Sequence, residues 1–157
     1  MQALISDIFE HLKRHGGMLA TAESCTGGMI AAMITDVPGS SAYFDRGFVT
    51  YSNESKRDQL KVPDTILEQY GAVSEQTALW MAEGALAHSR ALIAVSVTGI
   101  AGPGGGSADK PVGLVYIACA RRNSPVQAFR HNFTGNRQDI RKKSAQAALV
   151  HIRECLA

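Results

Sequence analysis

The chain of 157 residues lacks any apolar run long enough to cross a membrane. Its longest apolar runs, 91–97 and 112–120, are much shorter than the roughly 20 residues of a membrane-spanning helix, so they predict buried strands. The first residues include acidic side chains and no apolar region followed by a small-residue cleavage site, which argues against a secretory signal. We therefore expect a cytoplasmic protein with no membrane partner.

Cysteine pairs at metal-binding or redox spacing are also missing. Cys25, Cys119 and Cys155 are odd in number, lie far apart, and form no CxxC motif. We expect three reduced thiols.

The chain has little net charge, only +2 at pH 7. No basic face with interleaved aromatic residues accompanies that charge, and the basic run 137–143 is typical of a solvated helix face. We expect no nucleic-acid partner.

Hydrophobic residues make up 45% of the chain and charged residues 19%, as in an ordinary globular protein with one core. Hydrophobic periodicity and turn residues predict alternating helices and strands. The expected strands are 18–23, 42–51, 91–98 and a hairpin of 112–120 with 126–133, and the main expected helices are 3–15, one containing Gly27, Gly28 and 29–34, 74–89 and 137–155. This pattern predicts an α/β fold, a layered single domain over 1–157 with a mixed β-sheet flanked by helices.

The stretch TAESCTGG places Ser24 and Cys25 between a predicted strand and a predicted helix. A helix N-terminus presents unpaired N–H groups that bind a phosphate or an oxyanion. Position alone favours Ser24 or Thr26 as a helix N-cap, and a nucleophilic Ser24 is the alternative. Cys25 is a rival nucleophile because a helix N-terminus lowers a thiol pKa, although a small buried apolar residue is the simpler interpretation.

A serine nucleophile needs a base, and none of the five histidines has an acidic partner at motif spacing, so a Ser-His-Asp triad is unsupported. Lys56 is the other option, because burial favours the neutral amine of a lysine. It follows Tyr51 in TYSNESK, and a phenol there can relay or orient a proton. Taken alone, Lys56 is more typical of an exposed lysine on a helix.

The glycine-rich stretch VTGIAGPGGGSADKPVG is neither a P-loop nor a dinucleotide fingerprint, because no Gly-Lys-Ser/Thr follows and the glycines do not open a helix. Successive glycine N–H groups form anion-binding concavities, so the stretch is a candidate phosphate site. An unstructured surface loop is the alternative.

Taken together, TAESCTGG, DVPGSSAYFDRGFVTYSNESK, GAVSE and VTGIAGPGGGSADKPVG closely resemble the C-terminal domain of the competence-damage-inducible protein CinA. The resemblance runs from about residue 4 to 155, and the family includes stand-alone nicotinamide mononucleotide deamidases. It implies hydrolysis of the carboxamide of nicotinamide mononucleotide to nicotinate mononucleotide and ammonia, within NAD recycling. Late in the chain, FTGNR resembles a family signature, with Asn136 where aspartate is common.

Carried over by motif, the resemblance implies Ser24 as the nucleophile and Tyr51 and Lys56 as its catalytic partners. We expect the oxyanion to face backbone N–H groups near Thr26, Gly27 and Gly28. For the substrate phosphate we expect Thr98, Gly99 and the glycine loop at Gly102, with Arg137 or Arg141 as charge partners. We expect no metal and no cofactor.

Two alternatives stay open. The same pocket would serve a regulatory module that binds a pyridine nucleotide without turnover, or an amidohydrolase that uses Cys25. Symmetric oligomers are common, so we expect a homodimer or a higher homo-oligomer.

Overall fold

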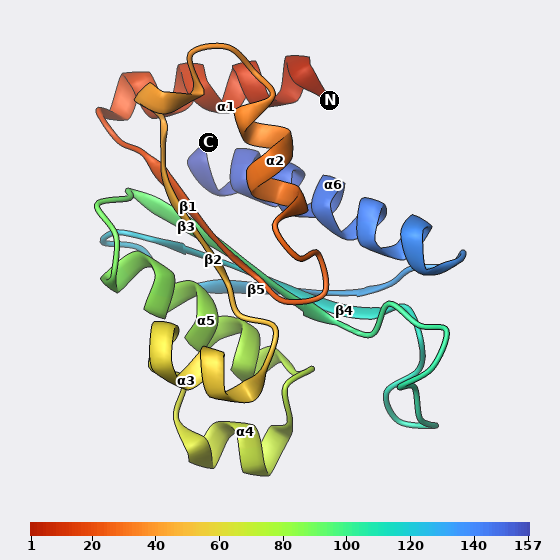
Figure 1. Ribbon diagram of the computed structural model, residues 1–157. Helices are drawn as coiled ribbons and strands as arrows, with labels where there is room; N and C mark the ends of the chain where they lie inside the picture. The colour runs from red at the N-terminus through yellow and green to blue at the C-terminus, as the bar shows by residue number, and fades with distance from the viewer.

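The computed structural model describes all 157 residues and has a five-stranded mixed sheet at its centre (Figure 1). The strand order is β2-β1-β3-β4-β5, in which β1, β2 and β3 are parallel and β4 and β5 are antiparallel additions. Since parallel strands end at one edge of a sheet, the residues that follow β1, β2 and β3 lie near one another. The strands are β1 Leu19–Glu23, β2 Phe44–Val49, β3 Ile93–Gly99, β4 Leu114–Arg121 and β5 Gln127–Asn132.

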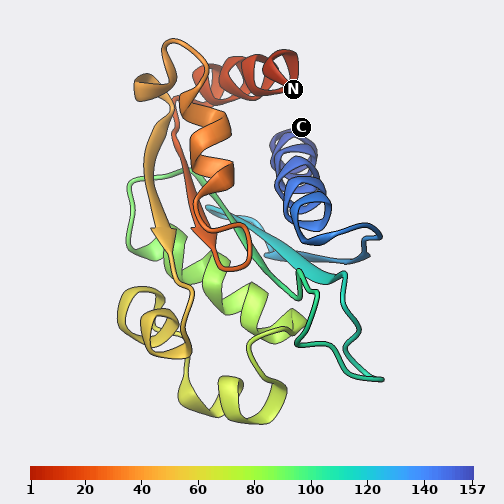
Figure 2. The same ribbon diagram turned by 45° about the vertical axis from the view of Figure 1, so that its right-hand side comes forward.

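Helices cover both faces of this sheet, as Figures 1 and 2 show. The first and last helices lie on one face together with α2, so the two chain ends are on the same side of the molecule (Figure 2). This layer comprises α1 Gln2–His15, α2 Met29–Thr35 and α6 Arg137–Leu156. The other face carries α3 Asn53–Leu60, α4 Asp64–Tyr70 and α5 Glu75–Ala87, and a short 3-10 turn, η1 Ser40–Ala42, precedes β2.

The two faces of the sheet are packed differently. Large aliphatic side chains from β3 and β4 meet α1, α2 and α6 on the first face, where 22 buried residues form the main core. On the second face the strands present mainly alanines, so α5 lies close to the sheet. Gly84 of α5 has no room for a side chain, because an added Cβ would lie 2.1 Å from the carbonyl oxygen of Leu60 at the end of α3.

The predicted single α/β domain with a mixed, helix-flanked sheet is confirmed. The strand expected over 42–51 is shorter, Phe44–Val49, because residues 40–42 form the 3-10 turn η1 and Tyr51 lies beyond the strand. The helix expected to contain Gly27 and Gly28 is also wrong: α2 begins at Met29, and the two glycines precede it in left-handed conformations (φ 60° and 96°). The reason is the buried Glu23 carboxylate, which accepts the N–H groups of Gly28, Ile30 and Ala31 and closes the helix start. Each of the six helices is too short or too polar to be a membrane-spanning segment.

Candidate active site

Lys56 reaches Ser24 across the sheet edge. Its Nζ lies 3.2 Å from the Ser24 Oγ and donates a 2.8 Å hydrogen bond to the carbonyl oxygen of Thr50. Lys56 is only 1% exposed, and this burial lowers its pKa from 10.5 to about 8. At pH 7 about a tenth of Lys56 is therefore a neutral amine beside a hydroxyl, far more than for a lysine with an ordinary pKa.

Local sequence explains how α3 carries this lysine. Ser52 caps the helix by accepting the Ser55 N–H, and the Ser55 hydroxyl oxygen accepts the Ser52 N–H, which completes a capping box. Lys56 is the next residue and points inward, as does Leu60 one turn later. The lysine thus projects from a fixed first turn, directly after the loop that follows β2.

A pocket of about 210 Å³ lies over these two side chains. Thr98 and Gly99 line it from the end of β3, and an added Cβ on Gly99 would lie 2.6 Å from the Val115 Cγ2. The Thr98 hydroxyl donates to the carbonyl oxygen of Ala72 (2.7 Å). The full lining is Ser24, Cys25, Tyr51, Lys56, Ala72, Val73, Thr98, Gly99, Ala101 and Arg137.

Tyr51 and Arg137 stand together in this lining. Arg137 donates to the Tyr51 Oη at 3.1 Å and to the carbonyl oxygen of Gly102 at 2.8 Å. Tyr51 is 63% exposed and forms no hydrogen bond with Ser24 or Lys56. Asn136 accepts the Asp139 N–H as the N-cap of α6, so it supports the helix that presents Arg137.

Cys25 adjoins Ser24 in the chain but belongs to the main core. Burial raises the pKa of its thiol to about 11, opposite to the lowering that a helix N-terminus causes. A protonated thiol is a poor nucleophile. The geometry therefore favours Ser24 over Cys25.

The backbone donors differ from those expected. The Gly27 N–H donates to the carbonyl oxygen of Ser24 (3.0 Å), and the Gly28 N–H donates to Glu23 (3.0 Å), so neither is free. The N–H groups of Cys25 and Thr26 have no acceptor within the chain. Thr26 is fully buried and does not line the pocket, and the Gly27 and Gly28 N–H groups are bonded within the turn, so these three expected oxyanion positions are corrected to structural ones. Sequence reasoning overlooked the Cys25 N–H, although its place directly after a candidate nucleophile is a usable signal.

Two expected phosphate ligands are placed elsewhere. Arg141 does not line the pocket; it donates to the carbonyl oxygens of Cys25 and Thr26, both at 3.0 Å. Gly102 also lies outside the lining and accepts the hydrogen bond from Arg137. Of the expected phosphate ligands, Thr98, Gly99 and Arg137 lie in the pocket. Ala72 and Val73 were missed, and no sequence signal distinguishes them.

No histidine lines the pocket. His131 and His151 instead face each other, with 2.9 Å between their Nε2 atoms, on β5 and α6. No group of three or more His, Cys, Asp or Glu side chains lies close enough together to hold a metal ion. The polar side chains of the pocket are therefore the hydroxyls of Ser24 and Thr98 and one thiol, one amine, one phenol and one guanidinium.

Comparison with known families places these residues in context. Residues 1–156 match the CinA C-terminal domain. A nicotinamide-nucleotide amidohydrolase PncC from Enterobacter agglomerans is 50% identical over 149 residues, which is 95% of this chain and 91% of that protein. A putative competence-damage inducible protein from Caldicellulosiruptor bescii is 54% identical over 136 residues, or 87% of this chain, but the match covers only 33% of its length. The chain thus spans about a third of the longer relatives and nearly all of the shorter ones.

Solved structures agree with the fold. The competence/damage inducible protein CihA from Agrobacterium tumefaciens superposes with a TM-score of 0.95 at 51% identity, covering 99% of this chain and 94% of that one. A competence damage-inducible protein A from Klebsiella pneumoniae gives a TM-score of 0.93 at 37% identity, covering 99% and 96%.

Proposed function

The chain belongs to the CinA C-terminal domain family, and we propose that it hydrolyses the carboxamide of nicotinamide mononucleotide with Ser24 as the nucleophile. The observation that carries the proposal is the buried contact between the Lys56 Nζ and the Ser24 Oγ at 3.2 Å. The support for the substrate is the roughly full-length similarity to proteins named nicotinamide-nucleotide amidohydrolase.

In the first step neutral Lys56 takes the proton of Ser24 as the Oγ attacks the amide carbon. The hydrogen bond from Lys56 to the Thr50 carbonyl fixes the amine, so that its lone pair faces the hydroxyl. Negative charge develops on the carboxamide oxygen. The free N–H group of Cys25, a residue that lines the pocket, adjoins the nucleophile and stabilises that oxyanion.

In the second step the tetrahedral intermediate collapses, and protonated Lys56 gives its proton to the leaving nitrogen, which departs as ammonia. Water then attacks the Ser24 ester with Lys56 again as the base, and nicotinate mononucleotide leaves. The net reaction consumes one water and releases one ammonia and one carboxylate.

A pocket of about 210 Å³ is smaller than the roughly 300 Å³ lower bound for sites that enclose drug-sized ligands. It therefore takes the pyridine carboxamide and leaves the ribose phosphate at its mouth. Arg137 and exposed Tyr51 stand there, and a guanidinium is suited to bind phosphate oxygens. Tyr51 thus acts on the substrate side of the pocket through its bond with Arg137.

The decisive test is an ammonia assay with nicotinamide mononucleotide, its riboside and free nicotinamide. We expect the mononucleotide to be the best substrate, and Ser24→Ala to lower kcat by about 10⁴-fold or more with the fold intact. Full activity of Ser24→Ala excludes the proposed nucleophile. Binding of the mononucleotide by calorimetry, without ammonia release from the wild type, would instead support a regulatory module.

We also propose that the protein assembles as a homodimer or a higher homo-oligomer and works in the cytoplasm on this small molecule. Sedimentation velocity of the purified chain tests the assembly, and a monomer at micromolar concentration excludes it.

A further inference from the structure

We propose that Thr98 is a specificity-determining residue, whose hydroxyl oxygen accepts a hydrogen bond from the carboxamide N–H of the substrate and disfavours the carboxylate of the product. The inference rests on the proposed amide hydrolysis at Ser24. It deepens that function by naming the group that distinguishes substrate from product, and it assigns Thr98 a task different from the phosphate contact expected from the sequence.

The position of Thr98 follows from the strand register. Strands β1 and β3 are parallel neighbours in which Glu23 pairs with Val97. The Ser24 N–H donates to the Val97 carbonyl oxygen at 3.0 Å, so the pairing extends one residue further. That next position places Ser24 beside Thr98, and both residues line the pocket. Thr98 is thus the strand neighbour of the proposed nucleophile.

Thr98 also faces the side of the sheet from which the base comes. Successive side chains of a strand point to opposite faces. Val97 belongs to the main core on the face of α1, α2 and α6, so Thr98 points to the other face, where α3 carries Lys56. The 2.7 Å bond from the Thr98 hydroxyl to the carbonyl oxygen of Ala72, between α4 and α5, agrees with this direction.

The hydroxyl proton of Thr98 is already committed to that bond. A backbone carbonyl only accepts, so the hydroxyl must be the donor to Ala72. A hydroxyl has one proton and two lone pairs, so the Thr98 oxygen has only lone pairs left for a ligand. Thr98 is 1% exposed, and a buried hydroxyl that gave up its partner would lose free energy, so this orientation is fixed.

The pocket is otherwise poor in acceptors for a carboxamide N–H. No carboxylate, carboxamide or imidazole side chain lines it. Among its side-chain oxygens, that of Ser24 is the proposed nucleophile, and that of Tyr51 accepts a hydrogen bond from Arg137. The amine of Lys56 needs its lone pair for the serine proton. Thr98 is therefore the side chain left to accept an amide N–H.

An oxygen that offers only lone pairs distinguishes an amide from an acid. A carboxamide nitrogen has two N–H donors, whereas an ionised carboxylate has acceptors only. Thr98 therefore attracts the substrate amide and repels the product carboxylate, which favours substrate binding and product release. After Lys56 has protonated the leaving nitrogen, the same oxygen accepts an N–H of the departing ammonia. Thr98 itself exchanges no proton in these steps.

The test compares Thr98→Val and Thr98→Ser with Ser96→Ala. Valine replaces the hydroxyl by a methyl group, and serine keeps the hydroxyl. Ser96 is the matched control, because it lies two residues earlier on the same face of β3 and donates to the Ala78 carbonyl oxygen at 2.6 Å, yet does not line the pocket. Thr98→Val and Ser96→Ala each leave one carbonyl without its donor, so both are expected to lower the melting temperature.

Two substrates separate amide recognition from destabilisation. With nicotinamide mononucleotide we expect Thr98→Val to lower kcat/KM about 30-fold and Thr98→Ser to stay within about 5-fold of wild type. The methyl ester of nicotinate mononucleotide has no N–H at the reacting group, so Thr98→Val should change its kcat/KM less than about 3-fold. Ser96→Ala should stay within about 2-fold on both substrates. Equal losses on amide and ester in Thr98→Val overturn the inference, as does an amide kcat/KM within about 3-fold of wild type.

Binding without turnover keeps this inference distinct from the proposed function. In Ser24→Ala at pH 9, where Lys56 with its pKa of about 8 is mostly neutral, calorimetry compares the affinities for the amide, the methyl ester and the carboxylate. We expect the amide to bind at least about 10-fold more tightly than the other two, and Thr98→Val in the same background to reduce that preference to about 2-fold.

The combined outcomes are distinct. An amide preference that depends on Thr98, in a protein whose wild type releases no ammonia, supports the inference and contradicts the proposed turnover. Ammonia release by the wild type without an amide preference in Ser24→Ala overturns the inference and leaves the proposed function intact, and this measurement does not require a Thr98 variant to fold. A protein that neither releases ammonia nor prefers the amide overturns both.

Discussion

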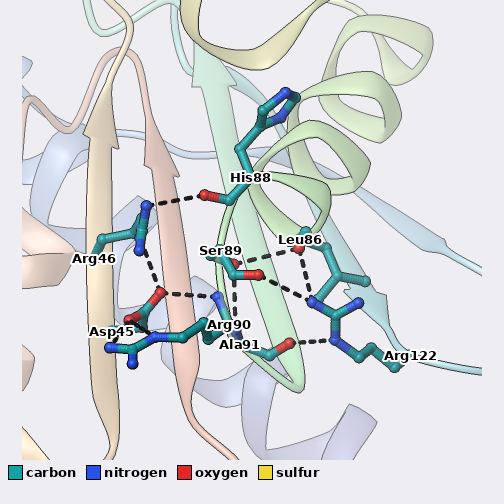
Figure 3. A network of polar contacts seen from close by, with 8 residues as sticks. All are labelled: Asp45, Arg46, Leu86, His88, Ser89, Arg90, Ala91 and Arg122. Atoms are coloured by element: carbon teal, nitrogen blue, oxygen red, sulfur yellow. Dashed lines mark hydrogen bonds and ion pairs between the residues drawn. The ribbon is translucent and has the colours of Figure 1, made fainter.

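The two ends of the parallel strands both use arginines to hold backbone carbonyls, and they differ in what they leave unpaired. At the carboxyl end Arg141 donates hydrogen bonds to carbonyl oxygens of the turn after β1. The N–H groups of Cys25 and Thr26 in that turn, and the buried Thr26 hydroxyl, have no hydrogen-bond partner. At the amino end Arg122 holds the segment between α5 and β3, and the Asp45 carboxylate there is paired with Arg46 and Arg90 (Figure 3).

Charge is treated differently at the two ends as well. The Asp45 side chain is only 2% exposed, and hydrogen bonds from Arg90 and Arg46 hold its pKa below the ordinary value. Lys56 is buried without an acidic partner, and its pKa falls to about 8. The amino end of the strands thus stabilises the charged form of Asp45, whereas the carboxyl end disfavours the charged form of Lys56. This difference is the physical signature of a reactive site, since perturbed ionisable groups in pockets cluster where catalysis occurs.

The largest expected effect comes from Lys56→Met, which removes the base. We expect kcat to fall by about 10³-fold or more, and wild-type kcat/KM to rise with pH to a plateau above about 8, where Lys56 is neutral. Initial rates of ammonia release between pH 6 and 10 measure both. A wild-type profile that is flat across pH 8 contradicts this role.

The same substitution tests whether the carboxyl end carries an electrostatic penalty. Below pH 8 folding buries a charged Lys56, whereas between pH 8 and 10.5 only the unfolded chain holds that proton, so wild-type stability rises with pH there. The shift from 10.5 to about 8 corresponds to about 3 kcal/mol. Urea unfolding at pH 7 and pH 10 is expected to show this gain in wild type relative to Lys56→Met. An identical pH dependence in both proteins argues against a buried lysine.

Asp45→Ala should have the opposite effect to Lys56→Met: the protein should lose stability and keep its activity. Removing a buried, charge-paired carboxylate costs about 2–4 kcal/mol, while kcat should change less than about 2-fold. Because the folded-state pKa is lowered, this contribution is present above about pH 4 and is lost as pH falls through the folded pKa. Asp64→Ala is the control: its ion pair with Arg57 leaves the Asp64 side chain 58% exposed, and its loss should cost less than about 1 kcal/mol. Equal losses of unfolding free energy for Asp45→Ala and Asp64→Ala, measured by urea unfolding, would contradict a special role of the Asp45 carboxylate.

Gly84→Ala should lower both the stability and the activity, because it moves the helix that carries Lys56. Its Cβ would lie 2.1 Å from the Leu60 carbonyl oxygen, so α3 must shift away from α5. We expect a loss of about 1–3 kcal/mol and a several-fold fall in kcat. Gly104→Ala, which has nothing within 4 Å, should change stability by less than about 0.5 kcal/mol. Thermal melts and ammonia release on the same samples decide, and unchanged kcat in Gly84→Ala contradicts the coupling.

The smallest expected effect is that of Cys25→Ala. With its thiol pKa raised to about 11, Cys25 stays protonated near neutral pH, so kcat should remain within about 3-fold of wild type. Iodoacetamide at pH 7.5 should leave the wild type active. Rapid inactivation together with alkylation of Cys25 on mass spectrometry would restore the rival nucleophile.

Local patterns in the sequence were sufficient for most of the fold. The amphipathic spacing of the first helix, the buried run before Gly99 and the hairpin around 121–125 all lie where hydrophobic periodicity placed them. The start of α2 was misplaced because it depends on Glu23, whose carboxylate closes the helix through the fold of the turn, and propensity does not encode that contact.

In the candidate site, too, some features follow from the sequence and others only from the tertiary structure. Sequence alone determined that Ser24, Tyr51 and Lys56 occupy motif positions, because the order of residue types along the chain carries that information. Only the tertiary structure decided that the Lys56 Nζ lies beside the Ser24 Oγ and that Arg141 donates to carbonyl oxygens of the turn. It also decided that Gly27 and Gly28 have no free N–H. The physical reason is that burial, pKa and hydrogen-bond partners depend on residues that come close only when the parallel strands end at one edge.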